Sequence, residues 1–182
     1  IQVIQPHEAT SELAGIYKKI EKERGKIAEV HKIQSLNPES IVRHMDLYMT
    51  VMFGRSPLKR AQREMMAVVV SKSNQCQYCI RHHAEALGHY WKDGHKIGQL
   101  INDFNKLELP DGDLLLCQYA QRVTLNPGGK EVEETINRMK SVGLGDRAIL
   151  DATLVVSYFN FVNRMVLSLG LELENEPGGY RY

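Results

Sequence analysis

Apolar side chains recur at three- and four-residue steps along most of this chain, which is the spacing of amphipathic helices. Between residues 7 and 24, for example, Leu13, Ile16, Tyr17 and Ile20 follow that spacing. No run alternates apolar and polar residues over more than a few positions, so the pattern predicts no β-sheet. We therefore expect an all-α fold, a helical bundle of about eight helices.

Prolines, glycines and short polar residues mark where the expected helices begin and end. Asn37-Pro38, for example, places a polar capping residue before a proline, which is a typical helix start. The expected helices cover residues 7–24, 39–53, 57–70, 76–87, 97–104, 113–125, 130–142 and 146–169, with a short helical piece at 27–35. The last helix is apolar nearly all round, which predicts burial on several sides and a subunit interface. We expect the tail from Glu172, with Pro177 to Gly179, to be loose.

The composition is that of one globular domain. The chain has 182 residues, 43% of them hydrophobic, which is enough for a sizeable core. We expect a single domain over residues 1–182, with a core at about 37–170 and an N-terminal helical extension at 1–36. Lys and Arg number 23 against 22 for Asp and Glu, a formal net charge of +1. This balance gives no reason to expect nucleic acid or an anionic membrane as a partner.

The sequence shows neither a membrane span nor a signal peptide. No apolar run approaches roughly 20 residues, and the N-terminus lacks a basic segment followed by an apolar core. The count of three cysteines is odd, whereas a secreted disulfide framework normally has an even count. We therefore expect a reducing compartment, the cytoplasm. Cys117 stands alone on an apolar helix face and is expected to be a buried structural thiol.

The stretch from Glu64 to His83 concentrates more reactive side chains than any other part of the chain. Cys76 and Cys79 form a C-x-x-C pair near the expected start of a helix. Free backbone N–H groups and the helix dipole favour a negative charge there, which makes Cys76 the more acidic thiol. His83 lies four residues after Cys79 and shares its helix face, and His82 lies three residues after it.

This placement matters because the thiolate, and not the thiol, is the nucleophile. An ordinary thiol has a pKa of about 8.5, so only about 3% is ionised at pH 7. Lowering that pKa by about two units makes most of the sulfur thiolate, and a helix start with a nearby imidazolium can supply the shift. Glu64 cannot stabilise a thiolate through its charge. We expect it to accept or relay a proton, or to orient a histidine.

The string E-x11-C-x2-C-x3-H at residues 64–83 resembles the core motif of the AhpD-like alkylhydroperoxidases, within the carboxymuconolactone decarboxylase superfamily. Residues 52–79 and 158–174 are similar to the "peroxidase-related" branch of that group. The resemblance covers most of the chain, in order. It implies an all-α fold that is usually a homo-oligomer, and thiol peroxidase chemistry without haem, flavin or metal. We therefore expect no bound cofactor and no metal.

Carried over by position, the resemblance implies that Cys79 attacks the peroxide and that Cys76 is the resolving partner. Glu64 and His83 match the proton-relay groups of the family. The implied activity is that of an oxidoreductase that reduces hydroperoxides to alcohols through a thiol–disulfide cycle. Its partners would be a hydroperoxide substrate and a thiol reductant protein, whose external dithiol can be a lipoyl group.

One position departs from the family pattern. The best-known members carry a histidine just before the second cysteine, whereas this chain has Tyr78. Tyr78 and His82 are therefore further relay candidates, with His82 able to take the place of the missing histidine, although we expect one of His82 and His83 to be a bystander. The remaining histidines are expected to be surface or packing residues: His7, His31, His44, His89 and His95.

Other readings of the cysteine pair remain open. A structural zinc site needs four ligands, and a second C-x-x-C is absent. The two cysteines with His82 and His83 would have to surround a tetrahedral ion from a single helix, where neighbouring side chains point about 100° apart. A thioredoxin-like fold would need βαβ units. A lyase of the carboxymuconolactone decarboxylase type, which does not need the cysteine pair, and a non-enzymatic metal-binding oligomer are the alternatives.

Overall fold

The computed structural model describes residues 1–174, and every regular element among them is a helix. The nine α-helices of this part of the chain are α1 (Ser11–Arg24), α2 (Glu29–Lys32), α3 (Pro38–Tyr48), α4 (Arg60–Ser73), α5 (Gln77–Trp91), α6 (Gly94–Asp103), α7 (Asp111–Leu125), α8 (Lys130–Ser141) and α9 (Asp146–Ser168). A π-helical turn, η1 (Met49–Phe53), continues α3, and a 3₁₀ turn, η2 (Phe104–Lys106), continues α6. The expected all-α bundle is confirmed, whereas the tail at Pro177 to Gly179 lies outside the described residues.

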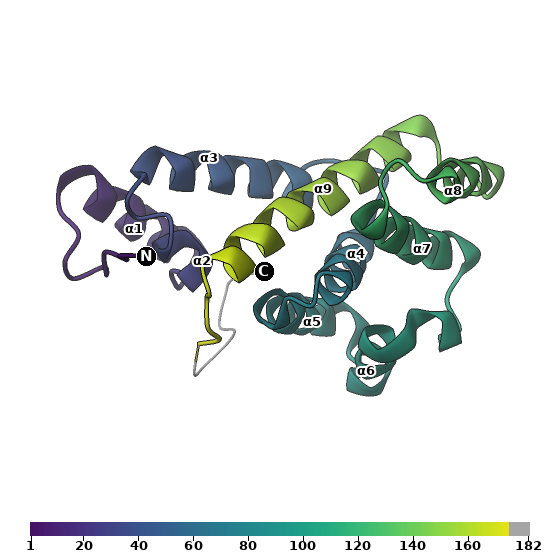
Figure 1. Cartoon of the computed structure of the whole chain (residues 1–182), viewed down its shortest axis with the longest axis horizontal. Coiled ribbons are helices and arrows are strands. Elements are labelled where there is room, and N and C mark those ends of the chain that lie inside the picture. Colours follow the sequence, from purple (N-terminus) through teal and green to yellow (C-terminus); the bar gives the residue numbers. More distant parts are fainter. Residues whose placement is uncertain (175–182) are drawn as a thin grey trace.

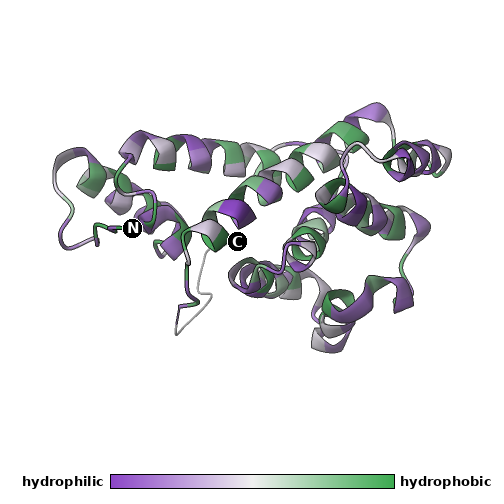
Figure 2. Cartoon of the chain, in the orientation of Figure 1, coloured by the Kyte–Doolittle hydropathy of each residue, from purple (hydrophilic) through white to green (hydrophobic). Residues whose placement is uncertain are grey.

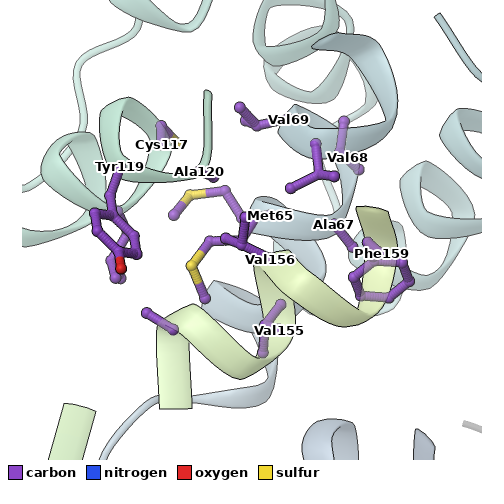
Figure 3. Packing of buried hydrophobic residues seen from close by; sticks show 14 of the residues in the cluster. Met65, Ala67, Val68, Val69, Cys117, Tyr119, Ala120, Val155, Val156 and Phe159 are labelled. Atoms are coloured by element: carbon purple, nitrogen blue, oxygen red, sulfur yellow. The ribbon is translucent and has the colours of Figure 1, made fainter. Parts of the chain in front are cut away.

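Helix α4 is the centre of the bundle, enclosed by α5, α7 and α9 (Figure 1). Its sequence explains this position, because residues 65–70 are all apolar and all buried. Figure 3 shows Met65 and Ala67 of α4 facing Val156 and Phe159 of α9. Full burial of one such large side chain stabilises the fold by about 1.5–3 kcal/mol. The helix that carries Glu64 is therefore held firmly from several sides.

Hydrophobic and hydrophilic positions alternate around the helix ribbons rather than collecting in one long segment (Figure 2). No helix among residues 1–174 has the length and apolar character to cross a membrane. Helix α9 buries one face, whereas Leu150, Leu154 and Phe161 on another face are exposed. The prediction of burial on several sides therefore holds for part of this helix, and the subunit interface stays a prediction.

The N-terminal segment has a small core of its own. Leu13, Tyr17 and Ile20 of α1 pack with Ile41 of α3 in a hydrophobic cluster separate from the main one. The Tyr17 hydroxyl donates to the Ile4 carbonyl at 2.9 Å, which ties the extended N-terminus to α1. This packing brings residues 24–31 beside α5 and α9, where they form part of a cavity wall.

The helix boundaries near the cysteines differ from those expected. Helix α4 continues to Ser73, whose hydroxyl donates to the Val69 carbonyl at 2.8 Å and so does not cap the next helix. Helix α5 continues through Gly88 to Trp91 and ends at Lys92, which has a left-handed backbone. The predicted end of this helix at residue 87 is therefore wrong, because Gly88 lies where α5 packs on α6 and tolerates the helical conformation.

Candidate active site

The two cysteines of the C-x-x-C pair lie at the junction of α4 and α5. Gln75 adopts a left-handed backbone, with φ of 59°, and turns the chain between the two helices. Cys76 is the residue directly before α5, and its backbone N–H donates to the Ser71 carbonyl at 2.9 Å. Cys79 follows in the first turn, so both sulfurs point the same way and lie 2.7 Å apart. A disulfide bond is about 2.05 Å long, so a small shift would join them.

Both thiols are buried, with 0% exposure for Cys76 and 2% for Cys79. The hydrogen bond between them lowers the pKa of the Cys76 thiol, although burial acts in the opposite direction. The same hydrogen bond, together with burial and the charge on Cys76, raises the pKa of Cys79. The start of α5 adds to this difference, because its dipole favours an anion at Cys76. When the pair loses one proton, the negative charge therefore falls on Cys76, and Cys79 keeps the remaining proton.

A cavity of about 90 Å³ reaches Cys79 but does not reach Cys76. Its wall is mostly aromatic and apolar and comes from the N-terminal segment, α3, α5 and α9. The lining residues are Arg24, Lys26, Ala28, Val30, His31, His44, Tyr48, Tyr78, Cys79, His82, His83, Ala86, Tyr158, Phe159 and Val162. A substrate in this cavity would meet the sulfur of Cys79 first, which agrees with the attacking role that the family resemblance implies.

A chain of three charged or ionisable side chains lies behind the cavity. Glu64, fully buried on α4, receives the His83 Nδ1–H at 2.7 Å on one oxygen and the Arg60 Nε–H at 2.9 Å on the other. Burial alone would raise the pKa of Glu64, but the attraction and hydrogen bonds of His83 and Arg60 outweigh burial and lower it. Glu64 is therefore an ionised acceptor, and Nδ1 of His83 must carry a proton. In neutral His83 the ring nitrogen Nε2 is then left with a lone pair for the cavity.

Arg60 was not anticipated from the sequence, although its position four residues before Glu64 on one helix was a usable signal. Its guanidinium also donates to the Met52 carbonyl at 3.2 Å and lies over the Phe53 ring, 3.6 Å from the centroid. These contacts hold the cation in place. Arg60 therefore supplies a permanent counter-charge for the buried Glu64 carboxylate, independent of the charge on His83.

The other two relay candidates share a second carboxylate. Glu174 accepts the Tyr78 hydroxyl at 3.0 Å and faces Nε2 of His82 at 2.8 Å. The Glu29 backbone N–H donates to the same carboxylate at 3.2 Å. Burial would raise the pKa of Glu174, but these hydrogen bonds lower it to about 2. The prediction of a loose tail is therefore wrong at Glu174, because three groups far away in the sequence bind it.

Two histidines that were expected to be surface or packing residues line the cavity instead. His44 is buried and its Nε2 lies 2.6 Å from the Tyr158 hydroxyl of α9. His31 packs beside it, with 5.4 Å between ring centroids. Burial lowers the pKa of His44 to about 4 and, with the nearby charges, that of His31 to about 3. Both rings are therefore neutral at pH 7, and Tyr158, Glu174 and Arg60 are the site residues that sequence reasoning missed.

The four side chains considered for zinc do not converge on one point. His82 is held by Glu174, and His83 by Glu64. Within residues 1–174 no group of three or more His, Cys, Asp or Glu side chains is arranged to hold a metal ion. Cys79, His83, Tyr78 and His82 do come together around one cavity. Cys76 and Glu64 do not line it, but each contacts a residue that does, Cys76 through Cys79 and Glu64 through His83.

Comparison with known proteins places this arrangement in context. Residues 40–100, which include both cysteines, match the model of the carboxymuconolactone decarboxylase family. No curated protein matches the sequence. Among solved structures, an uncharacterised peroxidase-related protein from Silicibacter sp. TM1040 is 27% identical, with a TM-score of 0.84 over 92% of this chain and 87% of the other.

Two further structures share the fold at lower identity. A peroxidase-related protein from Ralstonia eutropha JMP134, described as an alkylhydroperoxidase AhpD core, is 19% identical, with a TM-score of 0.83 over 96% of this chain and 92% of that one. The debrominase Bmp8, a cysteine-to-alanine variant in complex with 2,3,4-tribromopyrrole, is 14% identical, with a TM-score of 0.79 over 97% and 92%. Proteins with this fold therefore carry more than one activity.

Proposed function

Because the chain belongs to the AhpD-like carboxymuconolactone decarboxylase superfamily, we propose that it is a cysteine-based peroxidase that reduces organic hydroperoxides to alcohols. Named members of this superfamily are in general enzymes, among them alkylhydroperoxidases, decarboxylases and debrominases. The observation that carries the proposal is the pair of free sulfurs, 2.7 Å apart, of which Cys79 lines a cavity. Two thiols so placed can take up one oxygen atom from a peroxide and then close to a disulfide.

The first step is attack by Cys79. Its proton passes to the adjacent Cys76 thiolate or to Nε2 of His83, and the Cys79 thiolate then attacks the terminal oxygen of R–O–O–H. The O–O bond breaks as the S–O bond forms, so the sulfur is oxidised to a sulfenic acid and R–O⁻ leaves, to be protonated to R–OH. Condensation of this sulfenic acid with the Cys76 thiol releases water and leaves a disulfide.

The chain of Arg60, Glu64 and His83 supports this step. The ionised Glu64 holds the Nδ1–H tautomer of His83, so the lone pair of Nε2 can receive a proton on the cavity side. General-base catalysis of this kind typically contributes about 10²–10⁴-fold to a rate. Arg60 keeps the buried carboxylate ionised, and Glu64 is therefore a positioning residue in this proposal.

The cavity suggests the class of peroxide. Its aromatic and apolar walls, with Tyr48, Phe159 and Val162 among them, suit a small organic group rather than a polar one. Two basic side chains, Arg24 and Lys26, line the cavity, and none of its lining residues is an acid. We therefore propose that the substrate is a small organic hydroperoxide, neutral or carrying a carboxylate.

An external dithiol, for example a lipoyl group on a carrier protein, would reduce the disulfide by thiol exchange and complete the cycle. The cycle needs a reducing compartment, and we place it in the cytoplasm. We further propose a homo-oligomer, in which the exposed apolar residues of α9, Leu150, Leu154 and Phe161, would meet a second copy.

Quantitative thiol trapping tests the proposal. The reduced protein is mixed with one equivalent of cumene hydroperoxide, and the remaining thiols are alkylated and located by mass spectrometry. We expect loss of two thiols per chain, at Cys76 and Cys79, with Cys117 still free. Unreacted Cys76 and Cys79 would refute the proposal, and activity on a lactone that survives Cys79→Ser would favour the lyase alternative. One zinc per chain in protein purified without chelator would favour the metal-binding one.

A further inference from the structure

A second series of hydrogen bonds ends in the same cavity, on the wall formed by α3 and α9. It runs from Gln34 to His44 and on to Tyr158, three residues from separate segments of the polypeptide. The His44–Tyr158 contact joins residues 114 positions apart, and both side chains are buried. None of these three residues belongs to the cysteine motif. The role of Tyr158 depends on which atom is the donor in each of these hydrogen bonds.

Gln34 fixes the direction. Its Nε2 lies 2.7 Å from the Val30 carbonyl, which can only accept, so the amide nitrogen must face that carbonyl. The same nitrogen lies 2.8 Å from Nδ1 of His44 and donates its second hydrogen there. Nδ1 of neutral His44 is therefore the acceptor, and its proton is on Nε2. That Nε2–H donates to the Tyr158 hydroxyl oxygen at 2.6 Å.

The hydroxyl hydrogen of Tyr158 is then directed elsewhere. Its oxygen already accepts from His44, and no residue in the part of the chain from 1 to 174 accepts its hydrogen. Tyr158 lines the cavity together with Cys79. A buried O–H donor without an acceptor is costly, and an oxygen of a ligand in the cavity can relieve that cost. Burial raises the pKa of Tyr158 well above its usual value, so the group stays protonated near neutral pH.

We infer that Tyr158 is the catalytic acid for the departing alkoxide, with His44 and Gln34 as positioning residues. This inference rests on the proposed peroxidase function. As the Cys79 thiolate attacks, the O–O bond breaks and its electron pair moves to the R–O oxygen. Tyr158 gives its proton to that oxygen, and R–OH leaves. The Tyr158 phenolate is stabilised by the Nε2–H of His44. The proton that His83 took from Cys79 then passes through the cavity to the Tyr158 oxygen and restores the phenol.

Separate residues are needed because His83 cannot both accept the proton of Cys79 and donate a proton to the alkoxide in the same step. A neutral His83 with a free Nε2 lone pair can receive a proton, but it has none to give on the cavity side at the start of the reaction. Tyr158, by contrast, accepts the Nε2–H of His44 on its oxygen and still has its own hydrogen to give on the cavity side. The base on α5 and the acid on α9 therefore face the cavity from two separate helices.

The test compares two peroxides that differ in their need for an acid. Cumene hydroperoxide releases a tertiary alkoxide, which needs a proton, whereas peracetic acid releases acetate, which does not. For Tyr158→Phe we expect kcat/KM to fall about 100-fold with cumene hydroperoxide. With peracetic acid it should fall less than about threefold, since general-acid help is not required. The matched control is Tyr119→Phe, which also removes a buried hydroxyl, one bonded to Thr153 at 2.7 Å outside the cavity.

Substitutions of His44 provide a second test of the inference. His44→Gln keeps an amide N–H near the position of Nε2 and should retain most of the cumene hydroperoxide activity, whereas His44→Leu should show the same substrate-dependent loss as Tyr158→Phe. Equal losses of Tyr158→Phe with both peroxides, or no loss, in an active wild type would overturn the inference alone. A wild type that consumes neither peroxide would overturn the proposed function, and the inference with it.

Discussion

Replacing Glu64 by Gln would test the buried charge at the back of the site, because the change keeps the shape of the side chain and removes its charge. In the wild type, Glu64 is fully buried and Arg60 is 13% exposed. Glutamine leaves the Arg60 cation without its counter-ion, and breaking a buried pair in this way costs about 3–5 kcal/mol. Arg60 keeps its bond to the Met52 carbonyl and its place over the Phe53 ring. We therefore expect the lower end, about 3 kcal/mol.

The same substitution also reverses the tautomer of His83. If the amide oxygen faces Arg60, the amide NH₂ faces Nδ1 of His83, and two donors meet. His83 can relieve this clash by moving its proton to Nε2, which removes the lone pair from the cavity side. We therefore expect Glu64→Gln to lower peroxidase activity by about 10²-fold or more, in addition to the loss of stability.

The stability effect should depend on pH with a definite sign. The pKa of Glu64 is lowered in the folded protein, while an unfolded glutamate has a pKa of about 4.3. The stabilisation by ionised Glu64 is therefore fully present above the unfolded-state pKa and is lost as the pH falls through the lower, folded-state pKa. The difference between wild type and Glu64→Gln should be largest near pH 7 and shrink below about pH 4.

Urea unfolding at pH 7 and at acidic pH measures this difference in the free energy of unfolding. Thermal unfolding gives a second measure: for a chain of this size, we expect a decrease in Tm of about 6–12 °C at pH 7. Glu39→Gln is the matched control, since it breaks a pair in which Glu39 is 58% and Arg43 71% exposed, and it should change stability by less than about 0.5 kcal/mol. A Glu64→Gln protein that unfolds within about 0.5 kcal/mol of wild type at pH 7 would refute the reasoning about the buried pair.

Three other substitutions give separate predictions. Cys117→Ala should leave peroxide consumption and the two-thiol loss unchanged, because burial raises the pKa of Cys117 and keeps its thiol inert; reduced turnover would contradict this. Glu174→Gln should lower the urea midpoint of unfolding at pH 7, because an amide binds His82 and Tyr78 more weakly than a carboxylate; an unchanged midpoint would show that Glu174 does not tie residues 171–174 to α5. Arg24→Gln should raise KM several-fold for a carboxylate-bearing hydroperoxide and leave a neutral one nearly unaffected, since Arg24 lines the cavity and pairs with no carboxylate in residues 1–174. Parallel changes in both KM values would contradict an anion-binding role.

The parts of the site that follow from local spacing were accessible from the sequence. Cys76, Cys79 and His83 lie within two turns of one helix start, so their shared face follows from helix geometry alone. Glu64 was singled out by its chemistry and by the family motif. Its hydrogen bond to His83 depends on how α4 packs against α5, which no local pattern specifies.

The rest of the cavity depends on contacts between distant segments. His44 and Tyr158 are 114 positions apart, and His82 and Glu174 are 92 apart, so no periodicity connects them. Histidines that occur singly on amphipathic helices are usually packing residues, which is why the sequence predicts surface or packing roles for His31 and His44. Glu174 lies in a segment without regular structure, where sequence pattern gives no signal for a buried carboxylate.

The central claim is that the Cys76–Cys79 pair turns over with peroxide. Its most direct test is steady-state consumption of cumene hydroperoxide with dihydrolipoamide as reductant, for wild type and for Cys79→Ser. The account predicts sustained consumption by the wild type that depends on the dithiol, and none above background for Cys79→Ser. Equal consumption by the two proteins, or none by either, would contradict it.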